Sequence, residues 1–307
     1  AAICRVVNGM KRFTIGCIGA RTTAFKTTRF DEIGLQKNGI TVEAFDLSEV
    51  FYKVNAKEDN DPAVLAKKER LENYTDFSNV PEDKKIMLSK ISVVIDEYVE
   101  EYHLDALAIR CWNEMETILR VCPCVLLSEL NDRGIATSCE IDLTSAISMR
   151  AMQLASEQPT AVLDWNNNYG DAEDKLILFH CGSCAQSLMT KKGTVTSHKM
   201  FDKGDPGSGW GTNEGRIRPF KTTISNCLTV DGKIKIYASE AEFTDDPIED
   251  AYFGCAGVCQ IPNMEDKMIR LARGGFKHHT CVGVGHMKDI LKEAFTTYLG
   301  YEWVDID

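Results

Sequence analysis

Short apolar runs alternate with amphipathic segments along the first half of the chain. The runs predict buried strands over 12–19, 106–112 and 134–142, and residues 40–50 predict a strand that passes into a helix at Asp46 or Ser48. Helix patterns occupy 29–39, 60–72, 83–102 and 143–158. This alternation predicts a parallel sheet covered by helices, which binds ligands beyond the carboxyl ends of its strands.

The strongest helix signal lies in the segment 83–102. Its apolar residues recur at the spacing of one face of an α-helix, and they are Ile91, Val94, Ile95, Tyr98, Val99 and Tyr102. The segment feeds directly into the apolar run "ALAIRCW", so a long surface helix followed by a buried strand is expected.

The pattern changes after about residue 156. The runs "AVLDW", "DKLILFHC", "FKTTISNCLTV" and "GKIKIYASEAEF" predict strands, and turn signals such as Asp231-Gly232 separate them. Few helix signals are found until 286–299. We therefore expect a Rossmann-like parallel-sheet domain over 1–155, followed by a mostly antiparallel, β-barrel-like domain over 156–307.

Composition and charge argue against a nucleic-acid-binding, membrane-spanning or secreted protein. The chain of 307 residues has a net charge of −11 and no clustered Lys and Arg, which disfavours nucleic acid as a partner. No apolar run approaches the roughly 18–20 residues of a membrane span, and no signal peptide opens the chain. The twelve cysteines sit mostly in apolar runs, which favours reduced, buried thiols in a cytoplasmic protein.

Polar side chains gather at the ends of several predicted strands. Glu140 and Asp142 follow one strand, Asp164 follows another, and the pair His278-His279 precedes "TCVGV". Asp142 or Thr144 is expected to cap the next helix. Two carboxylates and one imidazole suit Mn²⁺, and less well Mg²⁺, Fe²⁺ or Co²⁺.

Other motifs offer alternative chemistry. Cys181-x-x-Cys184 and Cys255-x-x-x-Cys259 could form a zinc site or a redox pair, but the second spacing is loose and no helix start accompanies the first pair. The glycine-rich stretch 204–219 matches no phosphate-binding pattern. Within it, Arg216 and Arg218 are candidates for contact with an anionic or hydroxylated ligand.

Several of these stretches together resemble the L-fucose isomerase-like family. They are "AIRCWNEM", "LLSELNDRGIATSCEIDLTSAISM", "LDWNNNYGDAEDKLILFHCG", "EGRIRP" and "HHTCVGVGH", in that order. The opening "IGCIGARTTAF" is similar to the start of that family's second domain. The resemblance implies three domains, of which this chain, opening "AAICRVV" without Met, corresponds to the second and third. The absent first domain would help to close the active site of a homo-oligomer.

The resemblance also implies a set of site residues. Glu140, Asp164 and His279 match the family's metal ligands, and Glu140 and Asp164 would also carry protons during catalysis. His279 stands seven positions before His286 in the matching motif, and Asp164 stands 24 positions after Glu140. Substrate contacts are expected at Trp112, Asn166 and His180. His278 would be an outer neighbour of the site, and His286 would begin the final helix.

The implied reaction is the interconversion of an aldose and a ketose sugar. A divalent ion, expected to be Mn²⁺, would polarise the sugar carbonyl, and two carboxylates would move protons between C1 and C2. Two alternatives stay open: a degenerate sugar-binding relative without catalysis, and a cysteine-dependent zinc or redox protein. The residues do not specify the sugar.

Overall fold

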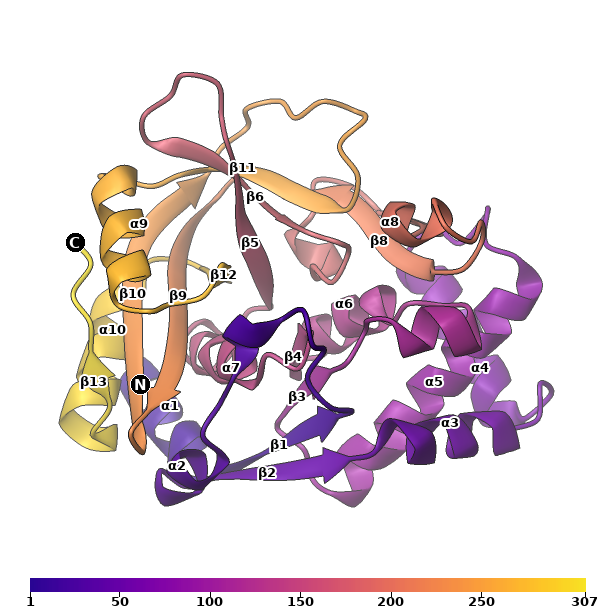
Figure 1. Cartoon of the computed structure of the whole chain (residues 1–307). Helices are drawn as coiled ribbons and strands as arrows, with labels where there is room; N and C mark the ends of the chain where they lie inside the picture. Colours follow the sequence, from indigo (N-terminus) through magenta and orange to yellow (C-terminus); the bar gives the residue numbers. More distant parts are fainter.

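The computed structural model describes residues 1–307 and contains two sheets (Figure 1). The first is a four-stranded parallel sheet with the strand order β2-β1-β3-β4. Its strands are β1 (Phe13–Ile18), β2 (Ile40–Phe45), β3 (Ala106–Ile109) and β4 (Ala136–Cys139). The carboxyl ends of all four strands therefore lie at one edge of the sheet, where Glu140 follows β4 directly.

The helices of the N-terminal half pack around this sheet. They are α1 (Ala2–Lys11), α2 (Glu32–Lys37), α3 (Leu47–Ala56), α4 (Pro62–Tyr74), α5 (Glu82–Glu101), α6 (Cys124–Asp132) and α7 (Leu143–Ser156), with a 3-10 turn η1 (Lys26–Thr28) and a π-helical turn η2 (Met115–Leu119). The periodic segment 83–102 is confirmed as α5, whose buried face packs against α3 and α4.

The second sheet has nine strands and is mostly antiparallel, with the order β13-β10-β9-β12-β5-β6-β11-β8-β7. Its strands are β5 (Thr160–Asn168), β6 (Lys175–His180), β7 (Thr194–Ser197), β8 (Trp210–Arg216), β9 (Phe220–Val230), β10 (Lys233–Phe243), β11 (Cys255–Gln260), β12 (His279–Val284) and β13 (Glu302–Trp303). A short pairing of β10 with β11 links six strands in a circle, so the sheet curls upon itself. The expected combination of a Rossmann-like sheet and a mostly antiparallel second sheet is confirmed.

The remaining turns and helices flank the second sheet. They are η3 (Gln186–Leu188), α8 (Lys199–Asp202), α9 (Met264–Arg273), α10 (Lys288–Glu293) and the π-helical turn η4 (Ala294–Leu299). Helix α9 corrects the expectation that helix signals nearly vanish before 286. The last helix begins at Lys288 after Met287, and not at His286.

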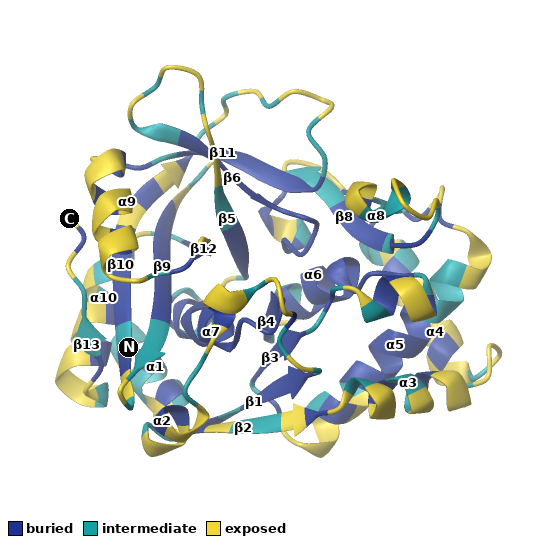
Figure 2. Ribbon diagram, in the orientation of Figure 1, coloured by how far each residue is buried: buried dark blue, intermediate teal, exposed yellow.

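Helix α7 connects the two sheets. It packs against β3 and β4 on one side and against β5, β9 and β12 on the other. Figure 2 shows it as buried along most of its length, in contrast to the exposed outer faces of α3 and α9. One hydrophobic cluster runs from α1 through α7 to Phe295 and Tyr301, so both sheets share a core. The boundary at 155/156 stays a prediction.

None of the helices is long and apolar enough to cross a bilayer.

Candidate functional site

The backbone at the end of β4 takes an unusual conformation that directs Glu140. Glu140 and Ile141 have φ angles of 62° and 58°, in the left-handed region that non-glycine residues, and β-branched ones above all, rarely adopt. Such strain persists where surrounding contacts enforce it, and it is concentrated at functional sites. Thr28 supplies one of these contacts, because its hydroxyl donates to the Glu140 carbonyl oxygen at 3.3 Å.

Asp164 and His279 are brought together by strand pairing. Strands β5 and β12 run antiparallel, and their register places Asp164 directly opposite His279. Residues opposite each other in such a pair project from the same face of the sheet. Although 115 positions separate them in the sequence, their charged atoms lie 3.4 Å apart, from the Asp164 Oδ1 to the His279 Nε2.

Two predicted ligands approach the third, His279, from different sides. The His279 Nε2 lies 3.3 Å from the Glu140 Oε2 and 3.4 Å from the Asp164 Oδ1. All three atoms are buried and have no hydrogen-bond partner. Ligands held about 2.1 Å from one ion lie about 3.0 to 3.4 Å apart at right or tetrahedral angles, and each carboxylate meets this distance to His279. Glu140 and Asp164 do not share a group of ligating atoms within 4.8 Å, so one of the two carboxylates would have to shift for both to bind the same ion. The donor set of two carboxylate oxygens and one imidazole nitrogen fits Mn²⁺ and related ions.

Two further histidines adjoin this cluster from different sides. Glu140, His180 and His279 form one group whose ligating atoms lie within 4.8 Å of one another, and Asp164, His278 and His279 form another. His279 belongs to both groups and therefore lies between the two carboxylates. A divalent ion would offset the repulsion between those carboxylates.

Asp142 contacts the ring nitrogen of His279 that does not face Glu140 and Asp164, and so orients the ring. The His279 Nδ1 and the Asp142 Oδ2 lie 2.7 Å apart, and Lys277 contacts the other oxygen of the same carboxylate. Burial alone would raise the pKa of Asp142, but the Lys277 ammonium and His279 outweigh it and hold that pKa well below its usual range. Asp142 is therefore ionised, so Nδ1 donates to it and Nε2 faces Glu140 and Asp164.

The charges around His279 also set its protonation. Burial alone would lower the pKa of His279, but its contacts with Asp142 and Glu140 raise the pKa to about 10. In the absence of an ion, the ring therefore carries a proton on Nε2 at neutral pH. Metal binding would displace that proton.

Asp142 has a second role that the sequence indicates. It is the N-cap of α7, and its side chain accepts from the Ser145 amide at 3.0 Å. The expected cap is thus confirmed, but the contact with His279 was missed. The only sequence signal for it is that Asp142 follows Glu140 by two positions, while Lys277 stands just before the histidine pair.

Trp112 belongs to a wall of rings beside the cluster. The ring of Phe25 lies 6.5 Å from that of His278 and 5.5 Å from that of Trp112, measured between centroids. The ring of Trp112 lies 6.0 Å from that of His198, which in turn lies 6.2 Å from that of Phe253. The sequence did not point to Phe25, His198 or Phe253.

Asn166 lies on β5, and His180 lies on the neighbouring strand β6. Asn166 is two residues after Asp164 on β5, and its side-chain oxygen accepts from the Tyr252 hydroxyl. His180 ends β6, is 1% exposed, and has an Nε2 without a partner. Of the two predicted arginines, Arg216 binds the backbone carbonyls of Glu249 and Tyr252, whereas Arg218 binds that of Ser187.

The other two histidines of the "HHTCVGVGH" motif are less buried than His279, and only His278 lies next to the cluster. The His278 side chain is 42% exposed, and its Nε2 lies 3.5 Å from the Asp164 Oδ1. Burial and the neighbouring His279 lower the pKa of His278. His286 lies away from the cluster, where its Nδ1 is 3.3 Å from Glu240.

The cysteines do not converge into the zinc site that was considered. Cys181 packs with Cys122 and Cys124, whereas Cys184 and Cys255 belong to a different cluster. No group of three potential ligands within 4.8 Å includes a thiol, and all twelve cysteines are free.

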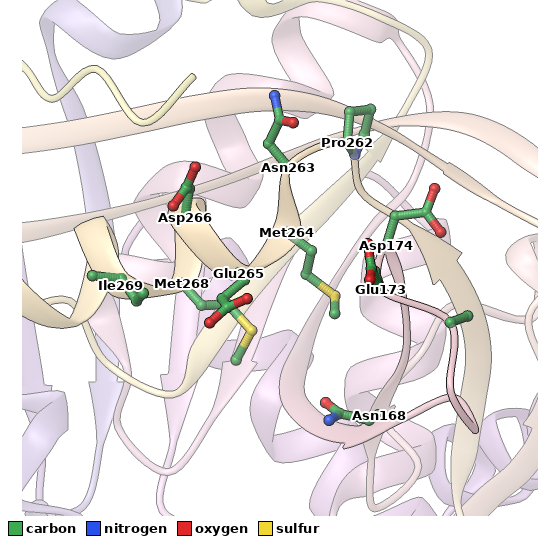
Figure 3. Close-up of a pocket in the computed structure, with 11 residues that line it drawn as sticks. Asn168, Glu173, Asp174, Pro262, Asn263, Met264, Glu265, Asp266, Met268 and Ile269 are labelled. Carbon is green, nitrogen blue, oxygen red and sulfur yellow. The ribbon is translucent and has the colours of Figure 1, made fainter.

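A broad groove elsewhere on the surface contains none of the predicted site residues (Figure 3). It lies between the end of β5 and the start of α9. Its lining is acidic, with the carboxylates of Glu173, Asp174, Glu265 and Asp266.

Comparison with known proteins shows which family the C-terminal part of the chain is similar to. Residues 178–307 match the family model described as L-fucose isomerase, C-terminal domain. This part of the chain is similar to that domain. The match includes His180 and His279, while Glu140 and Asp164 precede it.

Several relatives match a longer part of this chain. Sulfoquinovose isomerases from Priestia aryabhattai and Priestia megaterium are each 23% identical to it over 294 residues, which is 95% of this chain and 64% of each relative. A sulfoquinovose isomerase from Alkalicoccus urumqiensis is 28% identical over 183 residues, or 59% of this chain and 41% of the relative. The chain thus spans less than two thirds of the length of these relatives.

Proposed function

We propose that this chain holds the catalytic centre of a divalent-metal-dependent aldose–ketose isomerase. The observation that carries the proposal is that unpartnered, buried oxygens of Glu140 and Asp164 each face the unpartnered Nε2 of His279, whose Nδ1 contacts Asp142. The relatives named as sulfoquinovose isomerases support an isomerase in particular. Mn²⁺ is the proposed ion.

Glu140, Asp164 and His279 would hold the ion. When bound, it would polarise the sugar carbonyl and stabilise negative charge on the adjacent oxygens. Glu140 and Asp164 contribute carboxylates on different sides of His279, which suits the removal of a proton from one sugar carbon and its return to the neighbouring carbon. Burial of Glu140 and His279 limits the access of water to these groups.

Trp112 and Asn166 are proposed to bind the sugar. Trp112 offers an aromatic face on the ring wall, and Asn166 offers an amide two residues beyond Asp164. Sulfoquinovose, the sugar in the names of the relatives, is one candidate substrate and carries a sulfonate. Arg216, which makes no ion pair with a carboxylate, lies beside Tyr252 on the same side as Asn166.

The test is an isomerase assay with a panel of sugars. The protein, loaded with Mn²⁺, is incubated with sulfoquinovose, fucose, arabinose and ribulose, and products are identified by NMR. We expect one aldose–ketose pair to interconvert, and Glu140→Gln to abolish the conversion. Conversion of no sugar, while calorimetry still detects sugar binding, would favour the alternative of a non-catalytic sugar-binding relative.

We also propose that the full-length protein is a cytoplasmic homo-oligomer. The free state of all twelve cysteines supports a reducing compartment. Cell fractionation and light scattering test the two parts of this proposal.

A further inference from the structure

His180 faces the candidate metal cluster without a partner. It is the last residue of β6, its side chain is almost fully buried, and its Nε2 forms no hydrogen bond. One of its ring nitrogens lies within 4.8 Å of ligating atoms of both Glu140 and His279, and its ring centroid is 5.6 Å from that of His279. By distance alone, His180 could be a fourth ligand.

The backbone determines which nitrogen of His180 carries the proton. The Cys181 amide donates a hydrogen bond to the His180 Nδ1 at 3.0 Å. A backbone N–H can only donate, so Nδ1 must present a lone pair. A neutral imidazole has one N–H, and it therefore lies on Nε2. The ring nitrogen without a partner in the protein is thus a donor.

His279 has the opposite arrangement. Its Nδ1 faces the ionised carboxylate of Asp142 at 2.7 Å and donates to it, which leaves Nε2 to bind an ion once the ion has displaced its proton. With an ion bound, the two buried imidazoles would present different groups: a lone pair from the His279 Nε2 and an N–H from the His180 Nε2.

The backbone at His180 is held firmly in place. Its carbonyl accepts from the Cys255 thiol at 3.3 Å, and β6 pairs with β11 at the same residue. A Cβ at Gly254 would lie 2.5 Å from that carbonyl oxygen, so the backbones are in close contact. Turning the ring over would also leave the buried Cys181 amide without its acceptor.

We propose that His180 is a catalytic residue, which donates a hydrogen bond from Nε2–H to an oxygen of the sugar and does not bind the metal ion. The inference rests on the proposed isomerase function. A neutral donor fixed beside the reacting oxygens stabilises negative charge that develops there, without competing with Glu140 and Asp164 for the ion.

The first experiment compares His180→Gln with His279→Gln. Both variants are dialysed against Mn²⁺, and bound metal is measured by mass spectrometry. We expect His180→Gln to retain about as much Mn²⁺ as the wild type, whereas His279→Gln loses it. In the isomerase assay, kcat of His180→Gln should fall by about 10²–10³, the usual cost of losing one such donor. Circular dichroism and thermal melting check that both variants fold.

Two outcomes would overturn the inference: loss of Mn²⁺ from His180→Gln to the same extent as from His279→Gln, or retention of both Mn²⁺ and full kcat.

A second measurement needs no substrate. In ¹⁵N NMR spectra of the histidine side chains, the signal that His180→Gln removes should show a proton on Nε2, with and without Mn²⁺. Observation of that proton on Nδ1 refutes the inference.

The two failures are distinguishable. If the wild-type protein converts no sugar, the proposed function fails, while the metal content and the NMR spectra still decide whether His180 is a donor or a ligand. If the wild type is active and His180→Gln is equally active, only the inference about His180 fails.

Discussion

The His279 Nδ1 and the Asp142 Oδ2 lie 2.7 Å apart, although 137 positions separate the two residues in the chain. One carboxylate thus caps α7 and orients the candidate metal ligand on β12. Asp142→Asn should weaken Mn²⁺ binding by about 10–100-fold, because the ring loses its charged acceptor. Calorimetric titration with Mn²⁺ measures this change.

The control for this variant is another capping aspartate. Asp46 caps α3 but is exposed and distant from the cluster. Asp46→Asn should leave Mn²⁺ affinity unchanged. Asp142→Asn also leaves the buried ammonium of Lys277 without its partner, which should lower the free energy of unfolding by about 3–5 kcal/mol. The double variant Asp142→Asn, Lys277→Met removes this charge and is therefore measured as well. An unchanged Mn²⁺ affinity in a folded double variant would contradict the role of Asp142.

The two carboxylates that face His279 should be required for metal binding. Glu140→Gln and Asp164→Asn each remove an anionic ligand, so each should weaken Mn²⁺ binding by more than the roughly 10–100-fold that an outer partner contributes. Asp174→Asn, in the acidic groove of Figure 3, is the matched control and should bind Mn²⁺ as the wild type does. Equal losses in all three variants would show that general charge, and not this cluster, holds the ion.

Metal removal should lower the stability of the fold. A ligand that binds only the native state at 100 times its Kd stabilises it by about 2.7 kcal/mol. We expect Mn²⁺ at that ratio to raise the free energy of unfolding by about this amount, and a chelator to reverse the effect. Urea unfolding measures it, and His279→Ala should show no response to Mn²⁺. An equal response in that variant would place the ion elsewhere.

Glu116 should make stability depend on pH. Its carboxylate oxygens are buried without a partner, and burial, with a smaller effect from Cys124, raises its pKa to about 9. The native state therefore keeps a proton that the unfolded chain releases near pH 4.3. Stability should fall as pH rises between these values, by at most about 1.4 kcal/mol per pH unit.

The substitution Glu116→Gln isolates this effect. The variant cannot ionise, so its stability relative to the wild type should increase steadily from pH 5 to pH 9. Urea unfolding at several pH values gives the difference. A constant difference across this range would mean that Glu116 is ionised in the native protein.

One thiol should react with a reagent in solution, and the other eleven should be protected from it by burial. Cys4 is exposed, whereas the other eleven cysteines are buried. Ellman's reagent should therefore titrate one thiol in the native protein, none in Cys4→Ser, and twelve in the unfolded wild type without reductant. Several fast thiols in the native state, or fewer than twelve after unfolding, would disagree with the structure.

The sequence predicted those elements whose signals are local. The spacing of Ile91, Val94 and Ile95 fixed one face of α5, and Asp142 marked the start of α7. Helix α9 was missed although Glu265 and Asp266 lie in its first turn and Arg270 in its last, because its charged surface hides a narrow apolar stripe. Helix α6 is an apolar run with no clear period, which predicts strand as readily as helix.

The candidate site was predictable only in part. The family motifs drew attention to Glu140, Asp164 and His279, which the structure brings together. The bond between Asp142 and His279 depends on how α7 packs against β12, and no local pattern encodes that packing. The same holds for the tautomer of His180, since it follows from one backbone amide in the folded chain.

The pairing of β5 with β12 has a consequence for motion. Asp164 and His279 are held opposite each other by backbone bonds in the interior of the nine-stranded sheet, with β9 and β6 on either side. Neither residue therefore lies on a strand at the edge of the sheet. Separating them would require the pairing of two central strands to open, so the amide protons of this pair of strands should be among the slowest in the chain to exchange with solvent.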